Sequence, residues 1–167
     1  VCQAGGSPFN FLMKMERMEF PEAVAALAER ANIPLPTDPE PAAGGPPRKR
    51  DLVALHEQAA EFYARQLRGP GGKAALAYAR DRGFTEESIE RFGLGFAPDS
   101  WNALLRWGQT RRIGPDALLA AGLTARNERS GRVYDRFRNR LMFPIREAGG
   151  KAVGFAGRAL GDDPAKY

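Results

Sequence analysis

Tyr134–Ile145, which reads Y-D-R-F-R-N-R-L-M-F-P-I, decides the fold because charged and apolar residues alternate along it with the period of a β-strand. Arg136, Arg138 and Arg140 would share one face of this strand. The residues expected on the opposite, core-facing side are Phe137, Leu141, Phe143 and Ile145. At a rise of about 3.3 Å per residue, guanidiniums on one face recur roughly every 6.6 Å, which suits the phosphates of an extended single strand. The stretch therefore predicts a ridge of positive charge, although a solvated basic face on an ordinary sheet explains the same spacing.

The pattern around this stretch predicts two strands, Val133–Ile145 and Ala152–Arg158, joined across E-A-G-G-K. Pro144 has no backbone N–H, so its strand is expected at a sheet edge or with a bulge. Gly154 and Gly157 are consistent with strand twist or a bulge, and also with close approach of the backbone to a ligand.

The preceding eighty residues carry helical signals, with apolar side chains at three- and four-residue spacings. Thr85 is the expected N-cap of one helix, and Gly122 is expected to stop another. The expected helices are a first one through Leu52, Leu55, Ala59 and Phe62, then Lys73–Arg82, Thr85–Phe92, Ser100–Arg112 and Pro115–Ala121. Short helices followed by strands around one core predict an α+β fold.

The first fifty residues differ in composition from the rest. Pro8–Ala31 is expected to be helical, with Pro21 at a first helical position and with Val24, Leu27 and Ala28 forming one apolar stripe. Pro34–Pro47 is too rich in Pro and Gly for a packed element and predicts a linker at a domain boundary. The basic residues 48–50 that follow suit a solvated helix start or tether as well as a DNA contact.

Composition narrows the class of protein. The 167 residues are 43% hydrophobic, with a net charge of +5 and an isoelectric point near 9.7. Residues 131–167 hold eight Lys or Arg against four Asp or Glu, so the positive excess lies where the strands are expected. A basic balance of this kind suits a nucleic-acid partner, although it also serves solubility. The lone Cys2 and the lack of an 18-residue apolar run predict a cytoplasmic protein without a membrane partner.

The residues present do not form a recognisable active site. His56 is the only histidine and lies in a helical stretch, so no histidine-centred triad is indicated. Neither a phosphate-binding P-loop nor a dinucleotide-binding glycine motif is present. One cysteine and one histidine cannot supply the four ligands of a structural zinc site. Trp101 and Trp107 are expected to pack against the core rather than to stack on bases.

Five blocks in a fixed order nevertheless resemble one family. The blocks are C-Q-A-G-G-S-P-F-N-F-L-M-K-M-E (2–16), F-P-E-A-V-A-A-L-A-E-R-A (20–31), R-F-G-L-G-F-A-P-D-S-W (91–101), the quoted stretch 134–145, and G-F-A-G-R-A-L-G-D-D-P-A-K-Y (154–167). Together with the proline-rich gap, they resemble the bacterial replicative DNA primase family (DnaG), and the resemblance spans nearly the whole chain.

The resemblance implies a piece of a longer enzyme. Residues 1–33 would be the C-terminal remnant of a CHC2-type zinc-binding domain, 34–50 the linker, and 51–167 the N-terminal basic subdomain of the RNA polymerase domain. Cys2 would be the last of the zinc ligands, in a site that is incomplete here. A Toprim subdomain beyond Tyr167 would hold the catalytic Mg²⁺ or Mn²⁺, so the fragment alone is expected to be inactive and to carry no catalytic residue.

The same resemblance assigns the binding residues. Those expected to hold DNA or nucleotide are Arg82, Arg136, Arg138, Arg158, Lys166 and Tyr167. Guanidiniums bind phosphate through paired hydrogen bonds, Lys supplies a point charge and Tyr a stacking face. Arg82 also suits a helix end, and Tyr167 is the last residue of the sequence.

The implied function is synthesis of short RNA primers on single-stranded DNA by a DNA-directed RNA polymerase, a nucleotidyltransferase. Its partners would be the DNA template, ribonucleoside triphosphates, the RNA primer and, through another domain, the replicative helicase of a bacterial cytoplasm. The alternative is a non-catalytic module of the same fold that binds single-stranded DNA or recruits the helicase. Metal-binding carboxylates in the parent gene would favour the enzyme.

Overall fold

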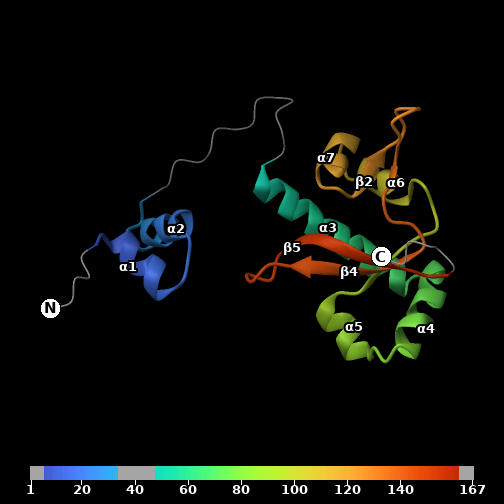
Figure 1. Cartoon of the computed structure of the whole chain (residues 1–167), viewed down its shortest axis with the longest axis horizontal. Coiled ribbons are helices and arrows are strands. Elements are labelled where there is room, and N and C mark those ends of the chain that lie inside the picture. Colours follow the sequence, from blue (N-terminus) through green and yellow to red (C-terminus); the bar gives the residue numbers. More distant parts are fainter. Residues whose placement is uncertain (1–5, 34–47, 162–167) are drawn as a thin grey trace. The chain divides into compact units, whose positions relative to one another are not determined.

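The computed structural model describes residues 6–33 and 48–161, and the chain divides into two compact units, 1–42 and 43–167. Cys2, Lys166 and Tyr167 lie outside the described residues. Each unit is described by itself below (Figure 1).

The first unit is a pair of helices, α1 (Pro8–Met15) and α2 (Phe20–Arg30). The single helical segment expected over 8–31 is therefore interrupted, and Arg17 in the break has a positive φ of 52°. The Glu22 carboxylate accepts a hydrogen bond of 2.9 Å from the Glu19 backbone N–H, which satisfies one of the unpaired donors at the start of α2. The two helices bury Leu12, Ala23 and Ala28.

Helices of the second unit follow the predicted pattern closely. They are α3 (Lys49–Arg68), the 3₁₀ turn η1 (Pro70–Gly72), α4 (Lys73–Asp81), α5 (Glu86–Phe92), α6 (Ala103–Thr110) and α7 (Pro115–Ala120). The Thr85 side chain accepts from the Ser88 backbone N–H, which confirms the expected N-cap of α5. Gly122 follows α7 with a φ of 68°, a conformation that favours glycine. None of these helices, nor α1 or α2, is long and apolar enough to cross a membrane.

Helix α3 begins inside the segment that was expected to be linker. The Asp51 carboxylate accepts from the Arg48 backbone N–H at 3.4 Å, and the helix starts at Lys49. The basic residues 48–50 thus include the first turn of a helix, which agrees with one of the two readings of that cluster.

The strands form two antiparallel sheets. They are β1 (Gly95–Ala97), β2 (Thr124–Arg126), β3 (Val133–Asp135), β4 (Arg140–Arg146) and β5 (Ala152–Ala159), with orders β1-β4-β5 and β2-β3. The predicted β4–β5 hairpin is confirmed, whereas β1 and β2 were not expected. β1 pairs only with residues 140–142, so β4 has one neighbour at Pro144, and a bulge follows at Ile145/Arg146. Pro144 thus lies where β4 has a free edge, and a bulge follows it, so both features predicted for this proline are present.

The expectation of one strand from Val133 to Ile145 is wrong. Residues 136–139 leave the strand, Asn139 has a φ of 48°, and β3 and β4 belong to different sheets. The physical reason lies at Asp135, whose backbone N–H donates to Trp101 O at 2.8 Å and whose carboxylate caps α6. These contacts hold β3 away from the larger sheet, so the chain turns before it reaches β4.

Two apolar clusters lie on opposite sides of the larger sheet. Figure 1 shows α6, α7 and β2 on one side of the β4–β5 hairpin and α4 and α5 on the other. Neighbouring residues of β4 point to different clusters, Met142 to the first and Leu141 to the second. Helix α3 serves both, since Phe62 belongs to the first cluster and Leu67 to the second.

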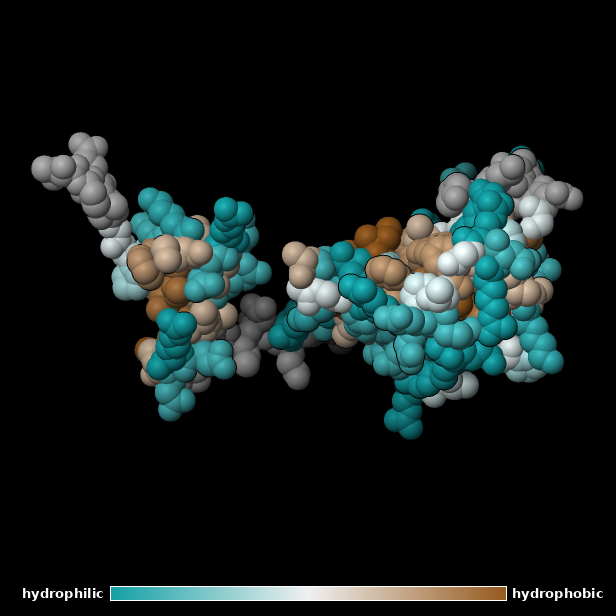
Figure 2. Space-filling view, turned by 90° about the horizontal axis from the view of Figure 1, so that it is seen from below, coloured by the Kyte–Doolittle hydropathy of each residue, from teal (hydrophilic) through white to brown (hydrophobic). Residues whose placement is uncertain are grey.

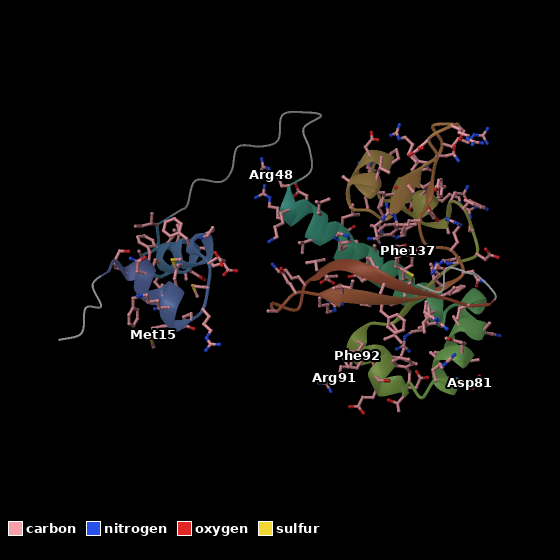
Figure 3. All side chains as sticks on the ribbon, viewed as in Figure 1. Met15, Arg48, Asp81, Arg91, Phe92 and Phe137 are labelled. Atoms are coloured by element: carbon pink, nitrogen blue, oxygen red, sulfur yellow. The ribbon has the colours of Figure 1, made fainter. Side chains whose placement is uncertain are left out.

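The core-facing side chains of the quoted stretch fall only partly where the alternation placed them. Phe137, labelled in Figure 3, packs against the first cluster and Leu141 is fully buried in the second, so both are in the core as expected but not on one face. Ile145 was expected in the core but is 52% exposed, because β4 has passed the end of β1 at this point. In the view of Figure 2, hydrophilic residues surround a smaller group of hydrophobic ones on the second unit.

Candidate nucleic-acid interface

The three arginines of the quoted stretch do not form the predicted ridge. Only Arg136 is exposed, in the turn between β3 and β4. The Arg138 guanidinium donates to the Asp135 backbone carbonyl, and Arg140 Nη1 donates to Gly157 O at 2.9 Å. The prediction of an even row of charges along one strand is therefore wrong. The strand breaks, and two of the three guanidiniums turn toward the protein's own carbonyls.

The Arg140 contact also explains one of the glycines. A Cβ at Gly157 would lie 3.0 Å from Arg140 Cδ and 3.1 Å from Phe137 Cδ1. The close neighbours of this glycine are the protein's own side chains, so packing is enough to account for it. A Cβ at Gly154 would meet nothing within 4 Å.

Arg138 instead builds an aromatic site with Trp101. Its Cζ lies 4.0 Å from the centroid of the Trp101 ring and 5.5 Å from that of Tyr134. The Trp101 and Tyr134 rings meet edge to face at 5.5 Å, and Trp101 is 64% exposed. A cation fixed over an exposed indole gives a flat surface that carries positive charge.

This surface belongs to a hollow of about 520 Å³, called here the Trp101 hollow. It is lined by Trp101, Asn102, Asn127, Ser130, Arg132, Val133, Tyr134 and Arg138. The lining combines aromatic faces, amide and hydroxyl groups and two arginines, and it includes no carboxylate. Such a set suits a stacked base with a neighbouring phosphate.

Trp101 is the residue that sequence reasoning misplaced. It was assigned with Trp107 to the core side of one helix, but α6 begins only at Ala103, so Trp101 is outside the helix and its apolar stripe. Trp107 does pack against the first cluster as expected. The signal in the sequence was Asn102, a residue type common at helix N-caps, directly after Trp101.

Asp135 holds the start of α6 and the backbone of Trp101 in place beside the Trp101 hollow. Its carboxylate accepts from the Leu104 and Leu105 backbone N–H groups at 2.7 and 3.1 Å, where α6 leaves donors unpaired. Burial raises the pKa of this carboxyl, while hydrogen bonds from the backbone of α6 and the charge of Arg138 act in the opposite direction. Sequence reasoning assigned Asp135 no role.

Arg82 and Arg158, which lie 76 residues apart, meet in a second hollow of about 370 Å³. This Tyr78 hollow is lined by Tyr78, Arg82, Phe84, Leu141, Phe143, Ala156 and Arg158. Arg82 follows the end of α4 and Arg158 projects from β5. Two of the residues predicted to bind DNA or nucleotide thus face one hollow.

Tyr78 lies between the two arginines. Arg158 Nε donates to Tyr78 Oη at 3.4 Å, and Arg82 Cζ lies 5.3 Å from the Tyr78 ring centroid. The hydrogen bond from Arg158 lowers the pKa of Tyr78, and the charges of Arg82 and Arg158 lower it further, against the effect of burial. Tyr78 was missed, although it lies four residues before Arg82, the C-cap of α4, a spacing that places the two side chains together.

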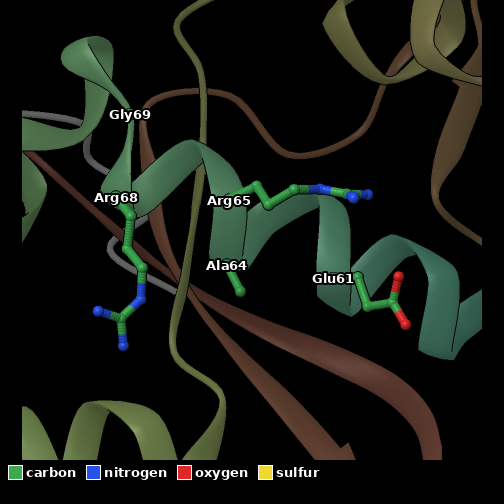
Figure 4. Close-up of a pocket in the computed structure, with 5 residues that line it drawn as sticks. All are labelled: Glu61, Ala64, Arg65, Arg68 and Gly69. Atoms are coloured by element: carbon green, nitrogen blue, oxygen red, sulfur yellow. The ribbon is translucent and has the colours of Figure 1, made fainter.

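A third hollow, of about 520 Å³, lies along α3 and is lined by Glu61, Ala64, Arg65, Arg68 and Gly69 (Figure 4). The Arg65 and Arg68 side chains diverge in this view, and no aromatic ring lies among the lining residues. It offers mixed charge without a stacking face, so it is a weaker nucleic-acid site than the other two.

The expected metals have no site among residues 6–33 and 48–161, where no group of His, Cys, Asp and Glu side chains could hold an ion. His56 is buried, and its Nε2 donates to Ala121 O at 3.0 Å, so it serves the fold. With one cysteine and one histidine in the sequence, the chain's own residues do not fit a four-ligand zinc site.

The fold and the two hollows define the class of the second unit. It is a small α+β domain that presents arginines beside aromatic rings, as domains that bind single-stranded nucleic acid do.

Comparison with known families is more specific. Residues 62–167 match the family described as the N-terminal domain of the DNA primase catalytic core, and residues 1–42 match the CHC2 zinc finger. The chain belongs to the DNA primase family, as its sequence blocks indicated.

Individual relatives agree. The DNA primase of Pseudomonas aeruginosa is 44% identical over 170 residues, which cover 99% of this chain and 26% of that protein. A solved DnaG primase catalytic domain bound to single-stranded DNA is 40% identical, with a TM-score of 0.66 over 71% of this chain and 38% of the solved one. The Aquifex aeolicus primase, solved with its zinc-binding and RNA polymerase domains, is 26% identical, with a TM-score of 0.62 over 97% of this chain and 38% of its own. The chain spans about a quarter of the length of the curated relatives it matches.

Proposed function

We propose that the second unit binds single-stranded DNA template for a primase, a DNA-directed RNA polymerase that makes short RNA primers for replication. Family membership supports the activity of the parent protein, and the relative solved with single-stranded DNA supports the ligand. The observation that carries the proposal is the Arg138 guanidinium held 4.0 Å over the exposed Trp101 ring.

The Trp101 hollow would receive a base of the template. A base can stack on the free part of the Trp101 surface while Arg138 and the exposed Arg136 attract the adjoining phosphates. Arg138 needs little ordering on binding, because its hydrogen bond to the Asp135 carbonyl already holds it. Binding at this hollow should tolerate any DNA sequence, since every base has a π-face that can stack.

The Tyr78 hollow would receive phosphate. Arg82 and Arg158 present two positive charges there, suited to a ribonucleoside triphosphate or to the backbone of a strand. Lys166 and Tyr167, which lie outside the described residues, are proposed to bind DNA or nucleotide on family resemblance alone.

The remaining parts of the proposal concern the parent protein. Residues 1–33 would complete a zinc-binding domain with Cys2 as one ligand, 34–50 would be the linker, and 51–167 would be the basic subdomain. Divalent Mg²⁺ or Mn²⁺, held by carboxylates outside this sequence, would stabilise the charge that develops in phosphoryl transfer. The described residues bind and orient the strands. The helicase contact, the RNA primer and a cytoplasmic location belong to this assignment of the whole enzyme.

Tryptophan fluorescence tests the binding proposal, because the chain has only two tryptophans. In a Trp107→Phe variant, oligo(dT) should quench the remaining Trp101, whereas the Trp101→Phe variant should show little quenching of Trp107. Loss of the stacking face in Trp101→Ala should weaken oligo(dT) binding about 5- to 150-fold. Equal quenching in both single-tryptophan variants, or unchanged affinity in Trp101→Ala, would refute the role of the Trp101 hollow.

A further inference from the structure

The Tyr78 hollow contains a residue to which the family resemblance assigned no role. Two guanidiniums that face one hollow repel each other, and the described residues that line this hollow include no carboxylate. The group that contacts both is Tyr78, which lies under Arg82 and accepts a hydrogen bond from Arg158.

We propose that Tyr78 is a positioning residue, which orients Arg82 with its ring face and Arg158 with its hydroxyl so that both guanidiniums bind one phosphate-bearing ligand. The inference rests on the proposed function of the hollow as a phosphate site and goes beyond it by naming the residue that sets its geometry.

A tyrosine suits this task better than an acidic residue would. An Asp or Glu between the arginines would orient them by forming ion pairs, but it would also repel an incoming phosphate. The phenol accepts from Arg158 without bringing a carboxylate charge into the hollow, while the ring attracts the Arg82 cation through its π-face. Tyr78 thus gives both guanidiniums a fixed direction and adds no acidic side chain beside them.

The positions of the three side chains follow from the fold. Tyr78 and Arg82 are one helical turn apart at the end of α4, so the ring and the guanidinium share a face. Arg158 reaches the same place from β5, where it pairs with Leu141 of β4. Phe84 and Phe143, whose rings are 5.9 Å apart, supply the apolar wall.

Substitutions at Tyr78 separate its two contacts. Tyr78→Phe keeps the ring under Arg82 and removes the acceptor for Arg158, whereas Tyr78→Leu removes both. Binding of inorganic tripolyphosphate and, in a separate arm, of oligo(dT) is measured by calorimetry on the whole chain. The tripolyphosphate arm reports a free polyphosphate ligand, and the oligo(dT) arm reports strand phosphates. Whichever probe loses affinity in Arg82→Ala and Arg158→Ala identifies the source of the phosphate.

For that probe we expect Tyr78→Phe to bind about 2- to 12-fold more weakly, the range for one lost hydrogen bond. The loss should vanish in an Arg158→Ala background and persist in an Arg82→Ala background, a pattern that general loosening of the fold would not produce. Tyr78→Leu should lose more and should couple to both arginines.

Arg80→Ala is the matched control. Arg80 lies on the same helix and pairs with Glu86 outside the hollow, so its loss should leave affinity within about 2-fold. Thermal unfolding of each variant checks the fold, and Arg158→Lys keeps the charge without the Nε donor if Arg158→Ala proves unstable.

The outcomes are distinct. If both arginine variants lose affinity but Tyr78→Phe binds like the wild type, the positioning role is overturned and the phosphate site stands. If neither arginine variant loses affinity for either probe, the phosphate site and the inference built on it both fail, while the Trp101 test remains independent.

Discussion

Replacing Asp135 with Asn should destabilise the second unit, and the structure gives the size of the effect. The carboxylate accepts from two backbone N–H groups of α6, and an Asn side chain offers only one oxygen to them. The donor that loses its acceptor costs about 1–3 kcal/mol because it lies at a buried helix start. At about 4 °C per kcal/mol for a unit of this size, the melting temperature should fall by about 4–12 °C.

Thermal unfolding by circular dichroism measures this change, with Asp116→Asn as the control. The Asp116 side chain is 86% exposed and forms only a surface ion pair with Arg126, so its loss should cost less than about 0.5 kcal/mol. An Asp135→Asn variant that melts within about 2 °C of the wild type would refute the claim that this carboxylate anchors α6.

The difference in stability between wild type and Asp135→Asn should depend on pH in a definite direction. Burial raises the Asp135 pKa above its ordinary value of 3.8, so folding favours the protonated form. The contribution of this group to the free energy of unfolding is therefore complete below that value and is lost as pH rises through the raised pKa. Denaturant unfolding should show a larger advantage of wild type over Asp135→Asn below pH 3.8 than at neutral pH, because the other groups are common to both. An advantage that grows toward neutral pH would contradict the direction of the shift.

Three further outcomes test other parts of the molecule. Arg136→Ala should reduce the slope of log affinity for oligo(dT) against log salt by about 0.7 without changing stability. Arg140→Ala should remove the hydrogen bond to Gly157 O and lower the free energy of unfolding in urea by about 1 kcal/mol. An unchanged slope would remove Arg136 from the interface. Gly95→Ala should cost about 1–3 kcal/mol, since its Cβ would lie 2.5 Å from a side chain of α3, while Gly71→Ala, with nothing within 4 Å, should be nearly neutral. Equal stability of the two glycine variants would refute that packing argument. The chain should bind zinc no better than its Cys2→Ala variant, as atomic absorption after dialysis would show, and stoichiometric zinc that depends on Cys2 would contradict this.

The sequence predicted those elements whose cause is local. Thr85 caps α5 and Gly122 ends α7 because cap and stop residues act within a few positions of themselves. β1 and β2 were missed, since strands of three residues carry no measurable alternation. β1 forms only by pairing with β4, more than forty residues away, and β2 by pairing with the equally short β3.

The break at residues 136–139 was missed for a different reason. The alternation of Arg and apolar residues fails there only at Asn139, whose positive φ marks the break. The contact that interrupts the strand is the attachment of Asp135 to α6, between residues some thirty positions apart. The same limit applies to the sites. Family motifs indicated Arg82 and Arg158 separately, but only the fold brings them to Tyr78.

Helix α3 joins what would otherwise be two separate small bodies. Phe62 and Leu67, little more than one turn apart on α3, pack in different clusters. Local unfolding of either half of the unit would therefore disturb the helix that both halves pack against. The Trp101 and Tyr78 hollows are attached to opposite halves. A strand that spans both hollows would therefore meet two binding sites whose separation is already fixed by one helix before binding.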